Sequence, residues 1–377
     1  MLIYYSMIIW LSSVSILKSN ANLDYEADSD YIYESLQDKN QKFSSRMPAW
    51  CICTYPDDNY FSYILSCSHD DPEDDVEIEV SNVEYVETTS INCKNGSSFK
   101  LFPDLTDHFG KSNIMLTNCM VPKNESINQL TNKISMNMKH LRIKFDKTKS
   151  KLKLDKNYFE GLLSLETLVI DMYKTNTTSL NANVFEHLDN LKYMMLLFVP
   201  LPDGIFDTLT KLQNLTIQSN IYKEFKGSDF NNHKMLVQFV LHCWFKYCSF
   251  DPLVFENLRN LEKLKIRRVE ISHIKMSNMM NLKIVVILRG NCEVFDENMF
   301  FNSTNIEEIK LDQINLKSLP KNIFQHQKKL NILSLSSTQL TELFDGTFDN
   351  TQNITILNLS HNRLTSISRY VTKTTNY

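Results

Sequence analysis

Residues 330–335 read Leu-Asn-Ile-Leu-Ser-Leu, and residues 354–359 read Ile-Thr-Ile-Leu-Asn-Leu. Both segments place apolar residues at their first, fourth and sixth positions, and they begin 24 residues apart. The last two apolar positions of each alternate with a polar one, which is the period of a short strand with one buried face. The pair therefore predicts a repeated structural unit that contributes one strand per copy.

Ten copies of this pattern follow one another from residue 138 onward. The nine steps between them average 24 residues, inside the range of 20 to 29 that is typical of leucine-rich repeats. The first apolar positions are Met138, Leu165, Leu191, Leu212, Leu236, Leu261, Leu282, Ile306, Leu330 and Ile354. Six residues before each start from Leu165 onward stand Phe159, Phe185, Phe206, Phe230, Phe255, Met276, Phe300, Phe324 and Phe348. Eleven residues before the same starts stand Leu154, Leu180, Leu201, Phe225, Phe250, Ile271, Phe295, Leu319 and Leu343.

One such repeat cannot bury its own apolar face, so it has to stack on its neighbours. The sequence predicts an α/β fold: a leucine-rich repeat solenoid, or horseshoe, with short parallel β-strands on its concave face and a disulfide-rich N-terminal cap. Each phenylalanine is expected to pack against the next in a buried column on the convex side. The consensus asparagine, eight residues after each start, is kept at Asn220 and Asn362, and it is replaced by Trp244, Val269, Gly290, Ile314 and Thr338. Its side chain is a hydrogen-bond partner for buried backbone groups, so we expect the repeats without it to lose that partner.

The segments ahead of the repeats differ in composition. Residues 1–21 carry a long apolar run that ends in small residues, as a signal peptide does; an uncleaved membrane anchor is the alternative. Residues 22–50 form an acidic polar tail, and residues 51–137 are expected to form the cysteine-rich cap, with Val-Glu-Ile-Glu-Val at 76–80 as an edge strand. The repeats fill residues 138–377 and lack a C-terminal cap, so we expect the sequence to be a fragment, a truncated gene product or an incomplete gene model.

In an exported protein, cysteines can form disulfides and Asn-x-Ser/Thr sequons can carry glycans. Cys243 and Cys248 are close enough in sequence to close a small loop, whereas Cys292 falls on an inward-facing position and is expected to be a buried thiol. The disulfide candidates, whose pairing the sequence leaves open, are Cys51, Cys53, Cys67, Cys93, Cys119, Cys243 and Cys248. The glycosylation candidates are Asn95, Asn124, Asn176, Asn214, Asn302, Asn353 and Asn358.

The sequence contains none of the catalytic motifs that we searched for. No His-Glu-x-x-His, Gly-x-Ser-x-Gly or phosphate-binding Gly-x-x-x-x-Gly-Lys motif occurs, so we expect no enzymatic activity; an enzyme carried on the solenoid is the remote alternative. No Cys-x-x-Cys pair occurs, and we expect neither a metal nor a cofactor. Lys plus Arg number 40 against 44 for Asp plus Glu, a net charge of −4, which argues against nucleic acid as a partner.

Binding to another protein is the better hypothesis, because the outward positions of the strands form one surface. Apolar residues at those positions often mark an interface. Register irregularities that turn some of them inward, or cover by glycans and loops, are the alternative. The ligand-binding candidates on the concave face are Met195, Leu197, Phe198, Val237, Val240, Lys265, Arg267, Ile284, Val286 and Leu288.

The cysteine pattern resembles that of the extracellular region of insect Toll receptors. The residues that carry the resemblance are Cys51-Ile52-Cys53, Cys67, Ile91-Asn92-Cys93 and Asn118-Cys119-Met120-Val121-Pro122 just before the repeats. The cysteine expected upstream of the Cys-x-Cys pair in that family is absent here, which leaves the pairing within the cap open.

The resemblance implies the ligand-binding region of a Toll-like receptor that binds a Spätzle-like protein, a dimeric cystine-knot cytokine, in innate immune or developmental signalling. It also implies a possible receptor dimer at the cell surface, attached to the membrane through a segment beyond this sequence. A secreted repeat protein that acts as a decoy, an adhesion module or an inhibitor is the second hypothesis. The transcript beyond residue 377 separates the two.

Overall fold

A computed structural model describes residues 51–54, 62–67, 76–83, 86–93, 113–119, 121, 125–129, 138–145 and 154–366, the last range without 174, 176–179 and 293–294. The chain divides into two units, residues 1–47 and 48–377, and every described residue belongs to the second. The predicted signal peptide, the acidic tail and the sequons Asn95, Asn124 and Asn176 lie outside the described residues.

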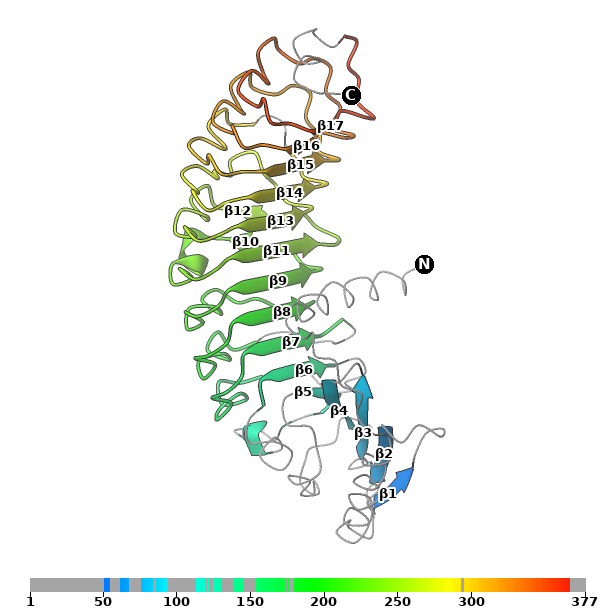
Figure 1. Ribbon diagram of the computed structural model, residues 1–377. Helices are drawn as coiled ribbons and strands as arrows, with labels where there is room; N and C mark the ends of the chain where they lie inside the picture. The colour runs from blue at the N-terminus through cyan, green and yellow to red at the C-terminus, as the bar shows by residue number, and fades with distance from the viewer. Residues whose placement is uncertain are drawn as a thin grey trace, which may run out of the picture. The chain divides into compact units, whose positions relative to one another are not determined.

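Fifteen of the described strands form one continuous sheet (Figure 1). Its strands, in spatial order, are β1 (Cys51–Thr54), β2 (Ser62–Cys67), β3 (Val76–Val83), β4 (Val86–Cys93), β5 (Asn113–Thr117), β6 (His140–Lys144), β7 (Thr167–Asp171), β8 (Tyr193–Leu197), β9 (Asn214–Ser219), β11 (Gln238–Cys243), β13 (Lys263–Arg267), β14 (Ile284–Leu288), β15 (Glu308–Asp312), β16 (Ile332–Ser334) and β17 (Ile356–Asn358). Behind them, β10 (Glu224–Phe225) pairs with β12 (Ser249–Phe250), and a 3₁₀ helix, η3, spans Gly227–Phe230.

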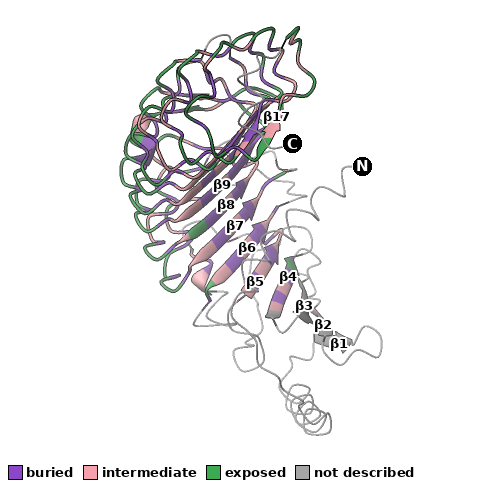
Figure 2. Ribbon diagram, turned by 45° about the horizontal axis from the view of Figure 1, so that its top comes forward, coloured by how far each residue is buried: buried purple, intermediate pink, exposed green. Residues whose placement is uncertain are grey.

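The strands fall where the repeat predicts them. Each of the ten strands from β6 onward in the large sheet begins two residues after the first apolar position of its repeat. Leu165 thus precedes Thr167, the first residue of β7, and Ile354 precedes Ile356, the first residue of β17. Their pairing is parallel throughout, and burial alternates along most of them (Figure 2). The predicted leucine-rich repeat solenoid is confirmed.

The first strands are connected differently. β1 to β4 pair antiparallel, whereas β4 pairs parallel with β5 and β5 pairs parallel with β6, so the parallel stacking begins ahead of residue 138. The prediction of an edge strand at 76–80 is wrong, because β3 lies between β2 and β4. Alternation in a sequence reports that the two faces of a strand differ, and it carries no information on whether both edges are paired.

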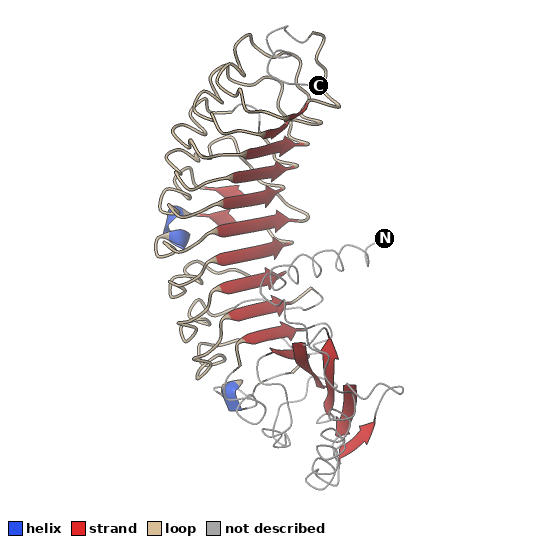
Figure 3. Cartoon of the chain, viewed as in Figure 1, coloured by secondary structure: helices blue, strands red, loops and turns tan. Residues whose placement is uncertain are grey.

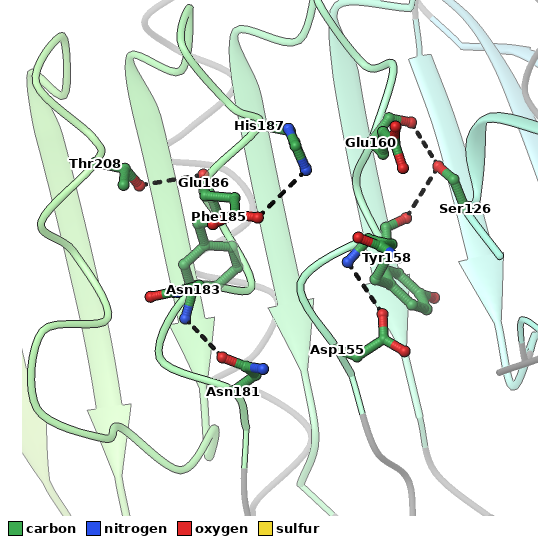
Figure 4. Close-up of polar contacts among 11 residues, drawn as sticks. Ser126, Asp155, Tyr158, Glu160, Asn181, Asn183, Phe185, Glu186, His187 and Thr208 are labelled. Atoms are coloured by element: carbon green, nitrogen blue, oxygen red, sulfur yellow. Dashed lines mark hydrogen bonds and ion pairs between the residues drawn. The ribbon is translucent and has the colours of Figure 1, made fainter. Parts of the chain in front are cut away.

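The chain returns from one strand to the next through tight turns on the far side of the sheet (Figure 3). Four residues before several of the column phenylalanines stands an Asp or Asn whose side chain accepts a hydrogen bond from the backbone two residues later. Asp155 accepts from the Asn157 N–H at 3.0 Å and Asn181 from the Asn183 N–H at 2.9 Å (Figure 4). Asp296 does the same for Asn298 at 2.8 Å. These turns aim the following phenylalanine at the core.

The predicted phenylalanine ladder is a buried column. Its members are all at most 4 % exposed, Met276 included. Phe324 is the clearest case, since its ring stacks on Phe300 at 6.4 Å and on Phe348 at 6.1 Å between centroids. In the middle of the solenoid, phenylalanines eleven residues before the repeat starts also contribute. The rings of Phe225 and Phe250 lie 5.4 Å apart between centroids, and they contact the column rings Phe230 and Phe255. Ring contacts on the side opposite the strands therefore join several pairs of neighbouring repeats.

The consensus asparagine works as expected at only one of its two predicted positions. The Asn362 side chain donates to the Leu335 carbonyl at 2.6 Å and accepts from the Thr338 and Leu340 N–H groups at 3.0 and 3.1 Å. Asn220 is exposed and does not take this role; the preceding Ser219 is buried instead.

In two of the repeats where the asparagine is replaced, other groups satisfy the backbone. In the repeat that carries Val269, the Glu270 N–H donates to the Cys248 carbonyl at 2.8 Å, and the Asn291 N–H donates to the Val269 carbonyl at 2.9 Å. Thr338 donates its hydroxyl to the Leu335 carbonyl at 3.0 Å. Extra backbone pairing and a short hydroxyl thus substitute for the amide, which explains how an apolar residue is tolerated there.

Two disulfides lie in the described part of the chain. One joins Cys93, the last residue of β4, to Cys119, and the other joins Cys243 to Cys248 across the predicted small loop. Cys292 is buried, as expected of a core thiol. The side chains of the other three cysteine candidates, Cys51, Cys53 and Cys67, lie outside the described residues.

Candidate ligand-binding surface

The outward positions of the strands carry most of the predicted binding residues. Nine of the ten candidates are half-buried and Lys265 is exposed, as expected for side chains on the free face of a sheet. They lie on β8 (Met195 and Leu197) and just after it (Phe198), just before β11 (Val237) and on it (Val240), on β13 (Lys265 and Arg267) and on β14 (Ile284, Val286 and Leu288).

The register separates these apolar residues into groups. Along the central row of the face, Met195 pairs with Thr216 of β9, which pairs with Val240. Lys265 then stands between Val240 and Val286. The surface therefore holds three apolar patches, and the one on β14 consists of Ile284, Val286 and Leu288, the three outward residues of that strand.

The strands that flank β14 are charged. On one side, β13 presents Lys263, Lys265 and Arg267 in register with the β14 residues. On the other side, β15 presents Glu308, Lys310 and Asp312, with Glu308 and Lys310 joined in an ion pair of 2.6 Å. The β14 patch is thus an apolar strip between a basic strand and a mixed one.

Two arginines stand in a left-handed backbone position at the end of these strands. Arg268 and Arg289 each follow the last residue of a strand and adopt φ of +56° and +55°, as Phe198 does after β8 with φ of +60°. This left-handed conformation is costly for a residue other than glycine. Hydrogen bonds to the next repeat hold it: the Arg268 N–H donates to the Leu288 carbonyl and the Arg289 N–H to the Asp312 carbonyl, both at 3.0 Å.

A pocket of about 70 Å³ lies at this edge, where β11, β13 and β14 end. Trp244 forms its aromatic wall; its indole N–H donates to the Gln218 side chain at 3.3 Å, and the Arg267 guanidinium lies 5.9 Å from its ring centroid. Arg268 donates to the Trp244 carbonyl. The pocket is lined by His242, Cys243, Trp244, Arg267, Arg268 and Arg289.

An aromatic row runs from the pocket along the same edge. The Trp244 ring lies 6.5 Å from that of Phe198, which lies 4.8 Å from that of Tyr173. Phe198 and Arg267 are among the predicted binding residues, whereas His242, Trp244, Arg268 and Arg289 are not. Two signals in the sequence point to this edge: the Cys243 and Cys248 spacing, and charged residues at the position just after a strand.

His242 is uncharged near neutral pH. Burial, followed by the nearby charges of Arg267 and Lys265, lowers its pKa to about 4. His242 takes up a proton near pH 6.5 in the unfolded chain but only near pH 4 in the folded chain. The free energy of unfolding therefore decreases as the pH is lowered from 6.5 to 4.

We expect the His242→Gln variant to lose part of this acid sensitivity. The pKa difference corresponds to a contribution on the order of 3 kcal/mol between pH 6.5 and pH 4. Urea unfolding of both proteins at several pH values measures it, and the comparison removes the contributions of His140 and His233, whose pKa values burial also lowers. Parallel stability curves would contradict the assignment to His242.

The described residues contain no cluster of three or more His, Cys, Asp or Glu side chains arranged for a metal ion. No helix within the described ranges has the length and the apolar character that crossing a bilayer requires.

Two protein-family models match the repeat region of the chain. A model of the BspA-type leucine-rich repeat region with 6 copies matches residues 125–262, and a leucine-rich repeat model matches residues 328–371. No curated protein matches the sequence.

Solved structures show the same fold. The Toll–Spätzle complex, a molecular hub in Drosophila development and innate immunity, aligns with a TM-score of 0.51 at 18% identity, over 86% of this chain and 49% of that chain. The TLR13–ssRNA13 complex aligns with a TM-score of 0.51 at 22% identity, over 69% of this chain and 40% of that chain. The chain spans about half the length of the Toll chain, and at these identities the likeness concerns the fold.

Proposed function

Because the chain is a leucine-rich repeat solenoid with the fold of Toll-like receptor ectodomains, we propose that it is an extracellular ligand-binding region of that kind. Its ligand in this proposal is a protein of the cystine-knot cytokine type, bound in innate immune or developmental signalling. The similarity to Toll in its complex with Spätzle supports a protein ligand. The TLR13 complex holds single-stranded RNA, so RNA is the competing ligand.

The β14 patch carries this proposal. Ile284, Val286 and Leu288 are half-buried on the free face of the sheet, and apolar side chains left there gain free energy when a partner covers them. The charged strands on both sides supply the polar rim that protein interfaces have. A nucleic acid would meet Glu308 and Asp312 beside the patch, which disfavours a phosphate backbone at this place.

We expect the Val286→Asp plus Leu288→Asp variant to lose capture of the ligand, with affinity reduced by about 100-fold or more. The fold should persist, because the new carboxylates face Lys265 and Arg267 across the pairing with β13. The assay is biolayer interferometry of the secreted chain against dimeric cystine-knot cytokines from the same source organism.

A matched control places an apolar-to-aspartate substitution on the same face but away from all the binding candidates: Met115→Asp on β5, which is half-buried like Val286 and pairs with Ser90 and Arg142. It should bind like the wild type and melt within about 2 °C of it. Wild-type affinity in the β14 variant would contradict the proposed interface.

A further inference from the structure

We infer that the pocket at the end of β11, β13 and β14 is an anchor for one acidic side chain of a protein ligand. This inference rests on the proposed function and adds the chemistry of the contact. It concerns the edge of the sheet, whereas the proposed interface lies on its face, so the two can be tested separately.

The size of the pocket limits what it can hold. Its volume of about 70 Å³ is far below the 300 to 1,000 Å³ of sites that enclose a whole small molecule. A carboxylate with its last methylene groups fits such a space, and a nucleotide base or sugar ring does not. The occupant is therefore the tip of a side chain whose remainder stays outside.

The pocket offers an excess of cationic donors. Each guanidinium has five N–H donors; Arg268 uses one on the Trp244 carbonyl, and Arg289 uses its Nε–H on the Gln313 side chain at 2.8 Å. Among the described residues no ion pair joins either arginine to a carboxylate, and none of the six lining residues is acidic. An arriving carboxylate would find paired, charge-assisted donors that are held in place by their second contacts.

The surroundings favour a single acid over a polyanion. The next outward residue beyond Leu288 in the sheet is Asp312, and Glu270, two residues after Arg268, accepts a hydrogen bond from the Asn291 side chain at 2.6 Å. The basic region is therefore about two strands wide, and the chain as a whole carries a net charge of −4. A phosphate backbone needs a longer positive track.

The disulfide loop adds an apolar contact beside the pocket. Cys243 and Cys248 close the loop that carries Trp244, and on it Phe245 is 77 % exposed and Tyr247 is 46 % exposed. Aromatic and arginine side chains are the types most enriched in binding hot spots. The ligand segment that fits is thus an acidic residue next to an apolar one.

Trp244 makes the inference measurable without the natural ligand. Tripeptide probes acetyl-Leu-Glu-Leu-amide and acetyl-Leu-Gln-Leu-amide are titrated into the full chain while tryptophan fluorescence is recorded, and the Trp244→Phe variant identifies the signal of this ring against those of Trp10 and Trp50. We expect a saturable change with the glutamate peptide and a response at least tenfold weaker with the glutamine peptide.

The Arg268→Gln plus Arg289→Gln variant should weaken the glutamate response at least tenfold. Arg259→Gln, an exposed arginine on the turn side of the neighbouring repeat, should leave it unchanged. Equal responses to the two peptides, or a wild-type response in the double variant, would overturn the acid anchor.

Two further arms separate the alternatives. A 13-nucleotide single-stranded RNA that binds tighter than the peptide, and loses affinity in the double variant, would also overturn the proposal in favour of a polyanion. The single Val286→Asp variant should keep the peptide response, because its new carboxylate faces Lys265, which does not line the pocket, and the probe does not need the β14 patch. A cytokine that binds the face while the peptide fails at the edge would leave the proposed function standing and remove only this inference.

Discussion

The Phe324→Ala variant should lose about 3–5 kcal/mol of unfolding free energy. Phe324 is fully buried, and its ring is stacked between Phe300 and Phe348, so truncation opens a cavity and breaks two ring contacts at once. Because stability in a repeat array is a sum of nearest-neighbour terms, the loss should separate the last repeats from the rest. Urea unfolding followed by far-UV circular dichroism measures it.

Two controls make this result specific to the column. Phe324→Met should cost much less, because Met276 already occupies the equivalent position and is fully buried. Phe245→Ala removes a ring that is 77 % exposed and should change stability by less than about 0.5 kcal/mol. A loss below about 1 kcal/mol for Phe324→Ala would show that the column does not hold the repeats together.

The second large effect is expected at the first disulfide. Replacing Cys93 and Cys119 by alanine should cost about 3.5 kcal/mol, because the bond closes a loop with a sequence separation of 26 residues and restricts the unfolded chain accordingly. It ties β4 to the residues after β5, where antiparallel pairing gives way to parallel pairing. Denaturation of the oxidised proteins at equal concentration provides the comparison.

The Cys243→Ala plus Cys248→Ala variant is the matched control for that experiment. Its separation of 5 residues predicts a loss of about 2 kcal/mol on the same chain-entropy scale. The order of the two losses is therefore the test. A larger loss from the small loop than from Cys93 and Cys119 would contradict loop closure as the main cause.

The parts of the fold that were predictable depend on contacts that recur at a fixed spacing. Leu165 and Ile354 each stand two residues before the strand of their repeat, β7 and β17, and Phe324 lies in the column as expected. The Cys243 and Cys248 loop was also predictable, because five residues are enough for closure and too few for many alternatives. The edge strand at 76–80 and the role of Asn220 were wrong for one reason. Both depend on what the adjacent segments do, and a local pattern does not contain that information.

The amino-acid sequence by itself determined the repeat, its strands and its buried side chains, since each repeat has to hide the same apolar positions against the next. Only the tertiary structure decided which outward residues become neighbours. Parallel register brings Lys265 between Val240 and Val286 and divides the apolar candidates, and Arg268 and Arg289, in left-handed turns after their strands, line one pocket with Trp244. These contacts join residues from different repeats, so their chemistry exists only once the strands are paired.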